Sequence, residues 1–400
     1  MNKYIENFFK KLDKPSIYWF VFVLAYLLTT FVIWKKYDFN PTCMVNFGQE
    51  FAKQNPQDMP KGAVVITGYE GDLGNGYDGQ IFYFYSRTIS NLTTSWPKGF
   101  DESYRAPRIG YPFLVAIFGL FGKYAAIFGM YFLNIALFGF SFWVLRKMLG
   151  EYQYLSWFYL LSPFSLGSYT VLVSDSVMVS LVIISYYFYT KDKFWAFIPI
   201  ASIAVLTKEP ALFFYFPLGL KNLLNKDFRK SLVVVFILVI PAFWYLYLKL
   251  TFPHWRPTRL TDFILPLEGI TTYLQTLYNS LDGSNWKDLA RAGSRIPLLL
   301  LFVVGIITTL TGKIQVGYVY RVGLLFTFFM VGVASYYHFW SVYENVSRMF
   351  TISIPLLILL KKEDTTVKTS VYFILCLLIF ALFLVKVVLI QKVQGFTIWG

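Results

Sequence analysis

The residues best suited to chemistry lie in one polar, glycine-rich stretch, residues 68–80, within a largely apolar chain. The stretch carries three carboxylates, Glu70, Asp72 and Asp78, among five glycines. Glycines allow a backbone to turn sharply and to approach a ligand closely. Carboxylates in such a turn can bind a metal ion, act as a catalytic acid or base, or simply remain solvated, so the rest of the chain must decide between these roles.

Three arginines lie at positions where the positive-inside rule does not predict cations. Arg105 and Arg108 follow the acidic stretch, and Arg348 comes late in the chain. An arginine can grip a phosphate through two parallel hydrogen bonds. Together with an acid, the three arginines suggest a polar cavity that can hold a phosphate, although each one alone can equally be a surface residue that faces lipid headgroups.

Further ionisable residues interrupt the apolar runs. Such groups are costly at membrane depth and are functional candidates by default. Asp175 can therefore belong to the site, or it can be a helix N-cap at a turn. Lys208 and Glu209 can also belong to the site, or they can form a local ion pair where Pro210 stops a helix. The sequence leaves these alternatives open.

The composition indicates the element type that must position these residues. The chain has 400 residues, of which 56% are hydrophobic and 14% charged, whereas a soluble domain carries about a quarter charged residues. Apolar runs near the ~20 residues needed to cross a bilayer recur along the whole chain. We therefore expect an all-α polytopic membrane protein with residues 1–400 in one transmembrane domain, and the lipid bilayer as a partner.

The apolar runs predict about eleven transmembrane helices. They lie at residues 17–34, 124–145, 155–173, 174–189, 194–207, 211–224, 231–250, 297–310, 319–335, 349–360 and 371–390. Most lysines and arginines fall in short connections between these runs, as the positive-inside rule expects. The net charge of +14 is explained in this way, and we expect no nucleic acid partner.

Alternation of the predicted spans places two long segments outside the cell. The N-terminus is basic and is expected in the cytoplasm. Residues 38–108 then form a long first external loop with interfacial helices, residues 81–89 being one candidate. Residues 251–295 form a second large external loop, in which residues 266–281 can form an amphipathic surface helix. All the candidate site residues fall on this external side.

The chain shows few signs of a bound cofactor. Its two cysteines, Cys43 and Cys376, and its two histidines, His254 and His338, have no metal-ligand spacing. A divalent cation held by the acidic stretch stays possible. The chain contains no Walker-type or dinucleotide fingerprint, so a soluble nucleotide-sugar donor is not indicated.

Two motifs carry a resemblance to a known family. They are Gly76-Tyr-Asp-Gly-Gln-Ile-Phe-Tyr83 and Tyr104-Arg-Ala-Pro-Arg-Ile-Gly-Tyr-Pro112. The chain resembles bacterial integral-membrane proteins of cell-surface glycopolymer formation, within the GT-C superfamily of polyprenyl-phosphate-sugar-dependent glycosyltransferases. Shorter similarities occur at Ser174-Asp175, at Leu206-Thr-Lys-Glu-Pro210 and at Glu344-Asn-Val-Ser-Arg348.

The resemblance implies a GT-C-like fold and an inverting glycosyltransferase in the bacterial inner membrane, with its active site on the external side. The donor would be a polyprenyl-phosphate-linked sugar, and the acceptor a glycan, lipid or protein. Asp78 would be the general base, with Asp72 and Glu70 as rivals, and Arg348, Arg105 and Arg108 would bind the donor phosphate. The remaining candidates for substrate binding are Tyr77, Gln80, Asp175, Lys208 and Glu209. Some enzymes of the superfamily require a divalent cation and others do not.

Two other classes of function compete with the enzyme. A transporter or flippase of lipid-linked glycans would carry ionisable residues near mid-membrane and often internal symmetry. The chain shows no internal repeat, and its acidic stretch lies in a loop, which favours the enzyme. A non-catalytic envelope-assembly protein with the same fold is the third possibility, since fold does not imply function.

Overall fold

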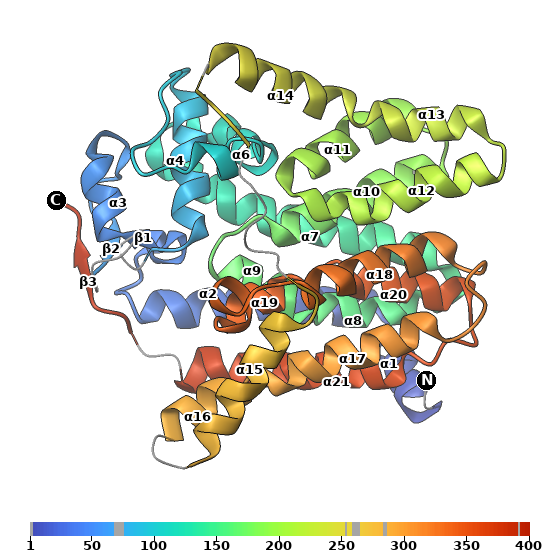
Figure 1. The fold of residues 1–400 in the computed structure, drawn as a ribbon. Coiled ribbons are helices and arrows are strands. Elements are labelled where there is room, and N and C mark those ends of the chain that lie inside the picture. The colour runs from blue at the N-terminus through green and yellow to red at the C-terminus, as the bar shows by residue number, and fades with distance from the viewer. Residues whose placement is uncertain (1–2, 68–75, 253, 258–264, 283–285, 391–392) are drawn as a thin grey trace.

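The computed structural model describes residues 3–67, 76–252, 254–257, 265–282, 286–390 and 393–400. Glu70 and Asp72 lie outside these ranges. The described chain is built almost entirely from helices, with one small sheet at one end of the molecule (Figure 1). This agrees with the expected all-α membrane class, apart from the sheet.

The helices follow one another along the chain with short connections. Those of the first half are α1 (Lys3–Leu12), α2 (Pro15–Lys35), α3 (Gln49–Gln54), α4 (Asp78–Ser90), α5 (Glu102–Arg105), α6 (Gly110–Gly119), α7 (Lys123–Leu149), α8 (Ser156–Leu160), α9 (Pro163–Thr170) and α10 (Asp175–Thr190). Those of the second half are α11 (Phe194–Thr207), α12 (Leu212–Leu224), α13 (Phe228–Phe236), α14 (Val239–Thr251), α15 (Glu268–Asn279), α16 (Trp286–Gly293), α17 (Ile296–Leu310), α18 (Tyr318–Gly332), α19 (Tyr343–Arg348), α20 (Ser353–Glu363) and α21 (Ser370–Val385).

Short segments complete the fold. The 3-10 turns are η1 (Pro41–Val45), η2 (Pro56–Asp58), η3 (Gly150–Leu155), η4 (Glu209–Ala211) and η5 (Ser280–Asp282). Two π-helical segments, η6 (Tyr336–Trp340) and η7 (Lys386–Ile390), precede α19 and extend α21. The strands are β1 (Phe47–Gly48), β2 (Val64–Ile66) and β3 (Phe396–Ile398).

Five helical stretches of the described chain are long and apolar enough to cross a membrane. They are Pro15–Lys35, Lys123–Leu160, Phe228–Thr251, Trp286–Leu310 and Ser370–Ile390. Shorter apolar helices accompany them at Gly110–Gly119, Asp175–Thr190, Phe194–Thr207 and Tyr318–Gly332. The total of about eleven crossings and the GT-C-like fold stay predictions.

The outer faces of these helices carry large apolar side chains. On α2, Phe20 is 65% and Leu27 63% exposed, whereas Phe22 and Tyr26 are buried against the other helices. A contiguous apolar surface of this kind is unusual on a soluble monomer and marks an interaction site. A lipid bilayer can cover this surface. A helix can lie in lipid because its backbone N–H and C=O groups are already hydrogen-bonded within the helix.

The two helices predicted in the external loops both form. The amphipathic helix expected within residues 266–281 is α15, with Ile270 and Tyr273 buried and Tyr278 exposed. The interfacial helix expected at residues 81–89 is α4, in which every residue from 79 to 88 is buried. These residues pack against other parts of the protein, and the expected position of this helix along the membrane surface stays a prediction.

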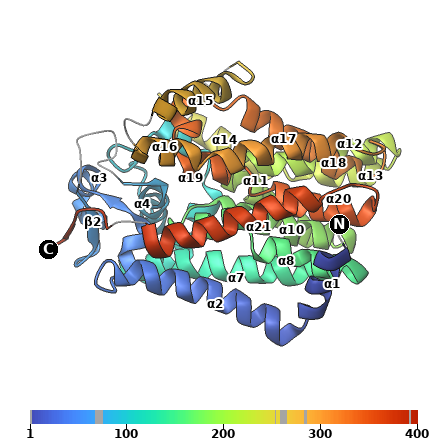
Figure 2. The ribbon, with the colours of Figure 1, turned by 90° about the horizontal axis from the view of Figure 1, so that it is seen from below.

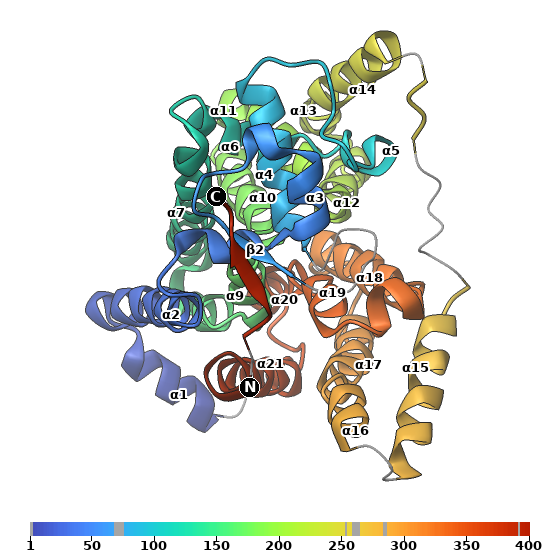
Figure 3. The ribbon, with the colours of Figure 1, turned by 90° about the vertical axis from the view of Figure 1, so that its left-hand side faces the viewer.

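A three-stranded sheet joins the C-terminus to the first loop. Strand β2 pairs in parallel with β1 and antiparallel with β3. Beyond β3, the Trp399 N–H donates to Ala63 O at 2.8 Å. We call the end of the molecule that carries this sheet the sheet end. Figure 1 shows α1 at the opposite end, and Figure 3 looks onto the sheet end.

Long helices connect the two ends of the molecule. Figure 2 shows α2, α7 and α21 running lengthwise between the sheet end and the N-terminal end. Helices α9 and α19 are short and lie closer to the sheet end. Residues at the termini of these helices can therefore meet residues of the first loop.

Candidate functional site

The Tyr77-Asp78-Gly79-Gln80 motif begins helix α4 at a point of very close packing. A Cβ at Gly79 would lie 2.5 Å from Val171 O and 2.7 Å from Val45 O. Both atoms belong to backbone that cannot yield, so only glycine fits there. The glycine of the motif thus brings the first turn of α4 against η1 and the end of α9.

The flanking residues of the motif fix this position by hydrogen bonds. The Gln80 Oε1 accepts from the Gly48 N–H at 2.8 Å, which ties α4 to strand β1. The Tyr77 N–H donates to Asn46 O at 3.1 Å. Gln80 is fully buried and holds the first turn of α4 in place, while its role in substrate binding stays a prediction.

Asp78, in the first turn of α4, is held by two arginines. Its Oδ1 accepts from Arg105 Nη1 at 3.1 Å. Its Oδ2 accepts from Arg348 Nη1 and Nη2, both at 3.2 Å. The Asp78 side chain is still 28% exposed. A carboxylate at a helix N-terminus is also favoured by the helix dipole, so the position suits the ionised form.

A second carboxylate lies on the other side of Arg348. Asp175, at the start of α10, accepts from Lys208 Nζ at 2.5 Å and from Arg348 Nη1 at 3.5 Å. Lys208 reaches it because α11 ends there: the residue is extended, with φ −165° and ψ 139°. We call Asp78, Asp175, Arg105, Lys208 and Arg348 the aspartate–arginine cluster.

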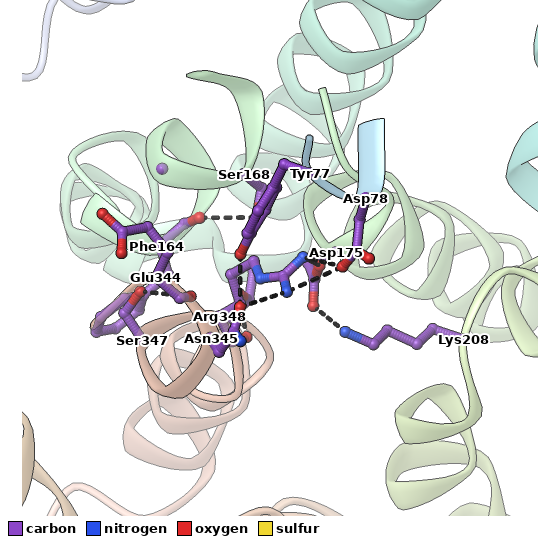
Figure 4. A network of polar contacts seen from close by, with 12 residues as sticks. Tyr77, Asp78, Phe164, Ser168, Asp175, Lys208, Glu344, Asn345, Ser347 and Arg348 are labelled. Atoms are coloured by element: carbon purple, nitrogen blue, oxygen red, sulfur yellow. Dashed lines mark hydrogen bonds and ion pairs between the residues drawn. The ribbon is translucent and has the colours of Figure 1, made fainter. Parts of the chain in front are cut away.

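Arg348 is also positioned by aromatic and amide groups (Figure 4). The Asn345 Oδ1 accepts from Arg348 Nη2 at 3.1 Å and from Tyr77 OH at 2.6 Å. The Arg348 guanidinium lies 5.0 Å from the centre of the Tyr77 ring, within the range of a cation–π contact. Tyr77 therefore belongs to the site through Arg348 and Asn345.

Arg108 and Glu209 form a separate pair beside the cluster. The Arg108 Nε donates to Glu209 Oε1 at 2.9 Å and to Oε2 at 3.1 Å. The pair is brought together by Gly110, where a Cβ would lie 2.5 Å from Ile203 O on α11. This close contact sets the start of α6 against the end of α11.

The electrostatics of the cluster favour ionised carboxylates. Burial pushes the pKa of Asp78 up, but the charges of Arg105, Arg348 and Lys208 pull it well below the ordinary value for an aspartate. Burial likewise opposes ionisation of Glu209, whereas the Arg108 guanidinium holds its pKa below normal. Asp78 is thus an anion at any physiological pH, with its charge matched by arginines.

No metal centre emerges from the described residues. Within those ranges, no group of three His, Cys, Asp or Glu side chains gathers closely enough to bind an ion. The oxygens of Asp78 and Asp175 instead accept from arginine and lysine. Glu70 and Asp72, which were candidates for joining Asp78 around a cation, lie outside the described residues, so the question of a divalent cation stays a prediction.

The structure brings most of the predicted residues together and corrects two readings. Asp175 is the first residue of α10 and caps nothing with its side chain, since the N-cap is Ser174; its carboxylate instead pairs with Lys208. Lys208 and Glu209 do not form a local ion pair, because each side chain pairs with a residue far away in sequence. Their roles in binding a substrate stay untested predictions.

Sequence reasoning missed two sets of residues. Asn345 lies one helical turn before Arg348, a spacing that puts the two side chains on one face, and this spacing was the signal for it. Glu344 and Lys386 form an ion pair beside Arg348. No short-range signal exists for that pair, because forty-two residues separate its members.

The long apolar helices define an integral membrane protein, and the aspartate–arginine cluster gives it a polar centre. The sequence profile of the EpsG family matches residues 63–398. The chain belongs to the EpsG family, whose members are membrane proteins with a polymerase- or glycosyltransferase-like role in polysaccharide assembly. No curated protein and no solved structure matches the chain.

Proposed function

We propose that this protein transfers a sugar, with inversion, from a polyprenyl-phosphate donor to a growing glycan on the external side of the membrane. The observation that carries the proposal is the position of Asp78, a partly exposed carboxylate between two guanidinium groups. A base and two cations within hydrogen-bond distance are the groups that such a transfer needs.

The reaction assigns a separate role to each charge. A hydroxyl of the acceptor gives its proton to Asp78, and its oxygen forms a bond to the anomeric carbon of the donor. The bond from that carbon to the phosphate oxygen breaks, and the lipid phosphate leaves with the electron pair. Arg348 and Arg105 stabilise the negative charge on the departing phosphate through charge-assisted hydrogen bonds.

The low pKa of Asp78 makes it a weak base while both arginines hold it. General bases work best when their pKa lies near the working pH. A donor phosphate competes with Asp78 for Arg348, and the loss of that cation raises the basicity of the carboxylate. The shared arginine thereby couples donor binding to activation of the base. Asp175 and Lys208 keep Arg348 in reach of both partners.

The remaining polar residues suit the acceptor. Glu209 has a side chain that is 55% exposed, although it is paired with Arg108. Tyr104 lies under Arg108, with 4.1 Å between its ring centre and the guanidinium carbon. A carboxylate with free lone pairs and an aromatic face can bind the hydroxyls and one face of a sugar.

The test is a transfer assay with purified full-length protein in lipid nanodiscs and a panel of polyprenyl-phosphate sugars. Asp78→Asn keeps the side-chain size but removes the base, so transfer should fall by about 10²–10⁴-fold while the protein stays folded. Glu50→Gln on α3 is the matched control and should transfer normally. Each assay is run with and without EDTA, which tests for a divalent cation. Full transfer by Asp78→Asn would overturn the base assignment.

Arg348→Ala separates binding from chemistry in the same assay. We expect weaker donor affinity, because the guanidinium would no longer meet the phosphate. Unchanged donor affinity would assign Arg348 a structural role.

A further inference from the structure

A cavity of about 80 Å³ lies beside the aspartate–arginine cluster. Arg348 lines it, whereas Asp78, Asp175 and Lys208 do not. One guanidinium therefore borders both the cavity and the cluster. We call this space the α2–α21 cavity.

The walls of the α2–α21 cavity are about half apolar, and much of the apolar part comes from helices. Ile33 belongs to α2, Phe164 to α9, and Phe383 to α21. Helices α2 and α21 are among those long enough to cross a membrane. Both helices also carry exposed apolar residues, such as Phe31 at 54% and Leu382 at 46%, within two residues of the lining residues Ile33 and Phe383. The cavity thus lies between two helices that face lipid.

The polar lining of the cavity is charged. The Lys386 ammonium pairs with Glu344, and their side chains are 38% and 41% exposed. Both residues and Arg348 line the cavity. Two cations and one carboxylate leave an excess of positive charge, so the lining favours an anion. The Nε of Arg348 is buried and makes no hydrogen bond, which leaves a donor in this region unused.

The backbone next to these residues is specialised. Lys386 begins the π-helical segment η7, and the π-helical segment η6 ends three residues before α19, which carries Glu344 and Arg348. Short π-helical turns cost helix stability and are frequent at functional sites. Within the described chain, both such segments adjoin the elements that carry these charges.

We infer that the α2–α21 cavity binds the phosphate headgroup of a lipid that enters between α2 and α21, with Lys386 and Arg348 as its cations. While the cavity is empty, Lys386 forms an ion pair with Glu344. When the phosphate binds, it replaces the Glu344 carboxylate as the partner of Lys386. The inference rests on the proposed function, to which it adds Lys386 as a further cation that binds the donor phosphate beside Arg348. The apolar half of the lining, which includes Ile33, Phe164 and Phe383, favours a lipid over free phosphate, because only a lipid also covers these side chains.

The charge state of Glu344 agrees with this exchange. Burial pushes the pKa of Glu344 up, but the Lys386 ammonium and the more distant Arg348 pull it below its ordinary value. The residue is therefore an anion in the empty cavity. A phosphate that binds Arg348 also weakens the contacts of this arginine with Asp78, which lie at 3.2 Å.

The test measures binding of farnesyl phosphate, a short lipid phosphate, to the full chain in nanodiscs of neutral lipid. Lys386→Gln removes a cation and should weaken binding by about tenfold or more. Glu344→Gln removes the competing carboxylate and should tighten binding several-fold. Lys61→Gln, an exposed lysine of the first loop, is the matched control and should leave binding unchanged.

Two further ligands separate the possible sources of the phosphate. Farnesol, which lacks the phosphate, should bind weakly and equally to all variants. Inorganic phosphate should not compete at millimolar concentration; if it displaces farnesyl phosphate, the cavity is a free-anion site and the lipid assignment fails. A photoreactive farnesyl phosphate should label α2 or α21, and labelling confined to other helices would also overturn the inference.

The outcomes distinguish this inference from the proposed function. If Lys386→Gln binds farnesyl phosphate like the wild type, the cavity does not hold the headgroup, whatever the transfer assay gives. If binding responds as expected but Asp78→Asn transfers normally, the lipid site stands and the base assignment fails.

Discussion

Two arginine–aspartate sites lie near the two ends of α20, and they are built differently. At one end, Arg348 is shared between Asp78 and Asp175 at 3.2–3.5 Å. At the other, Arg321 pairs with Asp364 alone at 2.7 Å. The helix between them has 11 residues, which corresponds to roughly 16 Å.

The site at Arg321 is saturated. Besides Asp364, the guanidinium donates to the carbonyls of Val316, Thr309 and Thr311. The second oxygen of Asp364 accepts from Thr366. The side chains of Arg321 and Asp364 are only 1% and 7% exposed. Each guanidinium nitrogen of Arg321 and both carboxylate oxygens of Asp364 have a protein partner, so the pair is committed to contacts within the protein.

The aspartate–arginine cluster, by contrast, has spare capacity. Its Asp78 is 28% exposed, its Arg348 has an unpaired Nε, and its arginine–aspartate distances of 3.1–3.5 Å are longer than the 2.7 Å between Arg321 and Asp364. A buried charge needs full pairing when its purpose is structural. The difference indicates that the Arg321 site holds the helices together, whereas the cluster is built to exchange partners.

Loss of the saturated arginine should have the largest effect on stability. Arg321→Leu leaves Asp364 buried without its cation and should lower the free energy of unfolding by about 3–5 kcal/mol. Thermal unfolding in detergent measures this. Asp78→Asn serves as the comparison and should change stability far less. Equal stability losses in the two variants would remove the distinction between the sites.

A substitution in the aspartate–arginine cluster should instead change the pH dependence of sugar transfer. Arg105→Gln removes the cation that contributes most to lowering the pKa of Asp78. The active form of Asp78 is the anion, and loss of the cation raises the pKa of this carboxyl group by about 1–3. The acidic limb of the pH profile of sugar transfer should therefore move to higher pH.

The lowered pKa of Asp78 also makes the free energy of unfolding depend on pH. The folded-state pKa of Asp78 lies below its unfolded value, so the stabilisation is present above the unfolded pKa, near 3.9, and is lost as pH falls through the folded pKa. Arg105→Gln should reduce this stabilisation. An acidic limb that stays in place would show that Asp78 does not titrate in the assay.

Loss of the Arg108–Glu209 ion pair should have the smallest effect on stability. Arg108→Gln removes a partner from Glu209, whose side chain is 55% exposed. Solvent screens such a pair, so the free energy of unfolding should fall by less than about 1 kcal/mol. A loss as large as that of Arg321→Leu would mean that the Arg108–Glu209 pair belongs with the structural sites.

Much of the helical framework could be predicted from sequence. The runs at residues 194–207 and 297–310 correspond closely to α11 and α17, since apolar length is a property of the local chain. The burial of α4 within the protein could not be predicted, because its aromatic residues fit a membrane surface as well as a protein interior. The pairing of β2 with β3 also escaped, since it joins segments that lie far apart in the chain.

The candidate site divides in the same way. The sequence by itself determined the membrane class, the polar residues and the motif around Asp78. Only the tertiary structure decided which charges meet: Lys208 turns to Asp175, and its neighbour Glu209 turns to Arg108. Adjacent residues take distant partners because helix α11 ends there and the packing of the helices brings Asp175 to one side chain and Arg108 to the other. That choice depends on long-range contacts, which residue spacing does not encode.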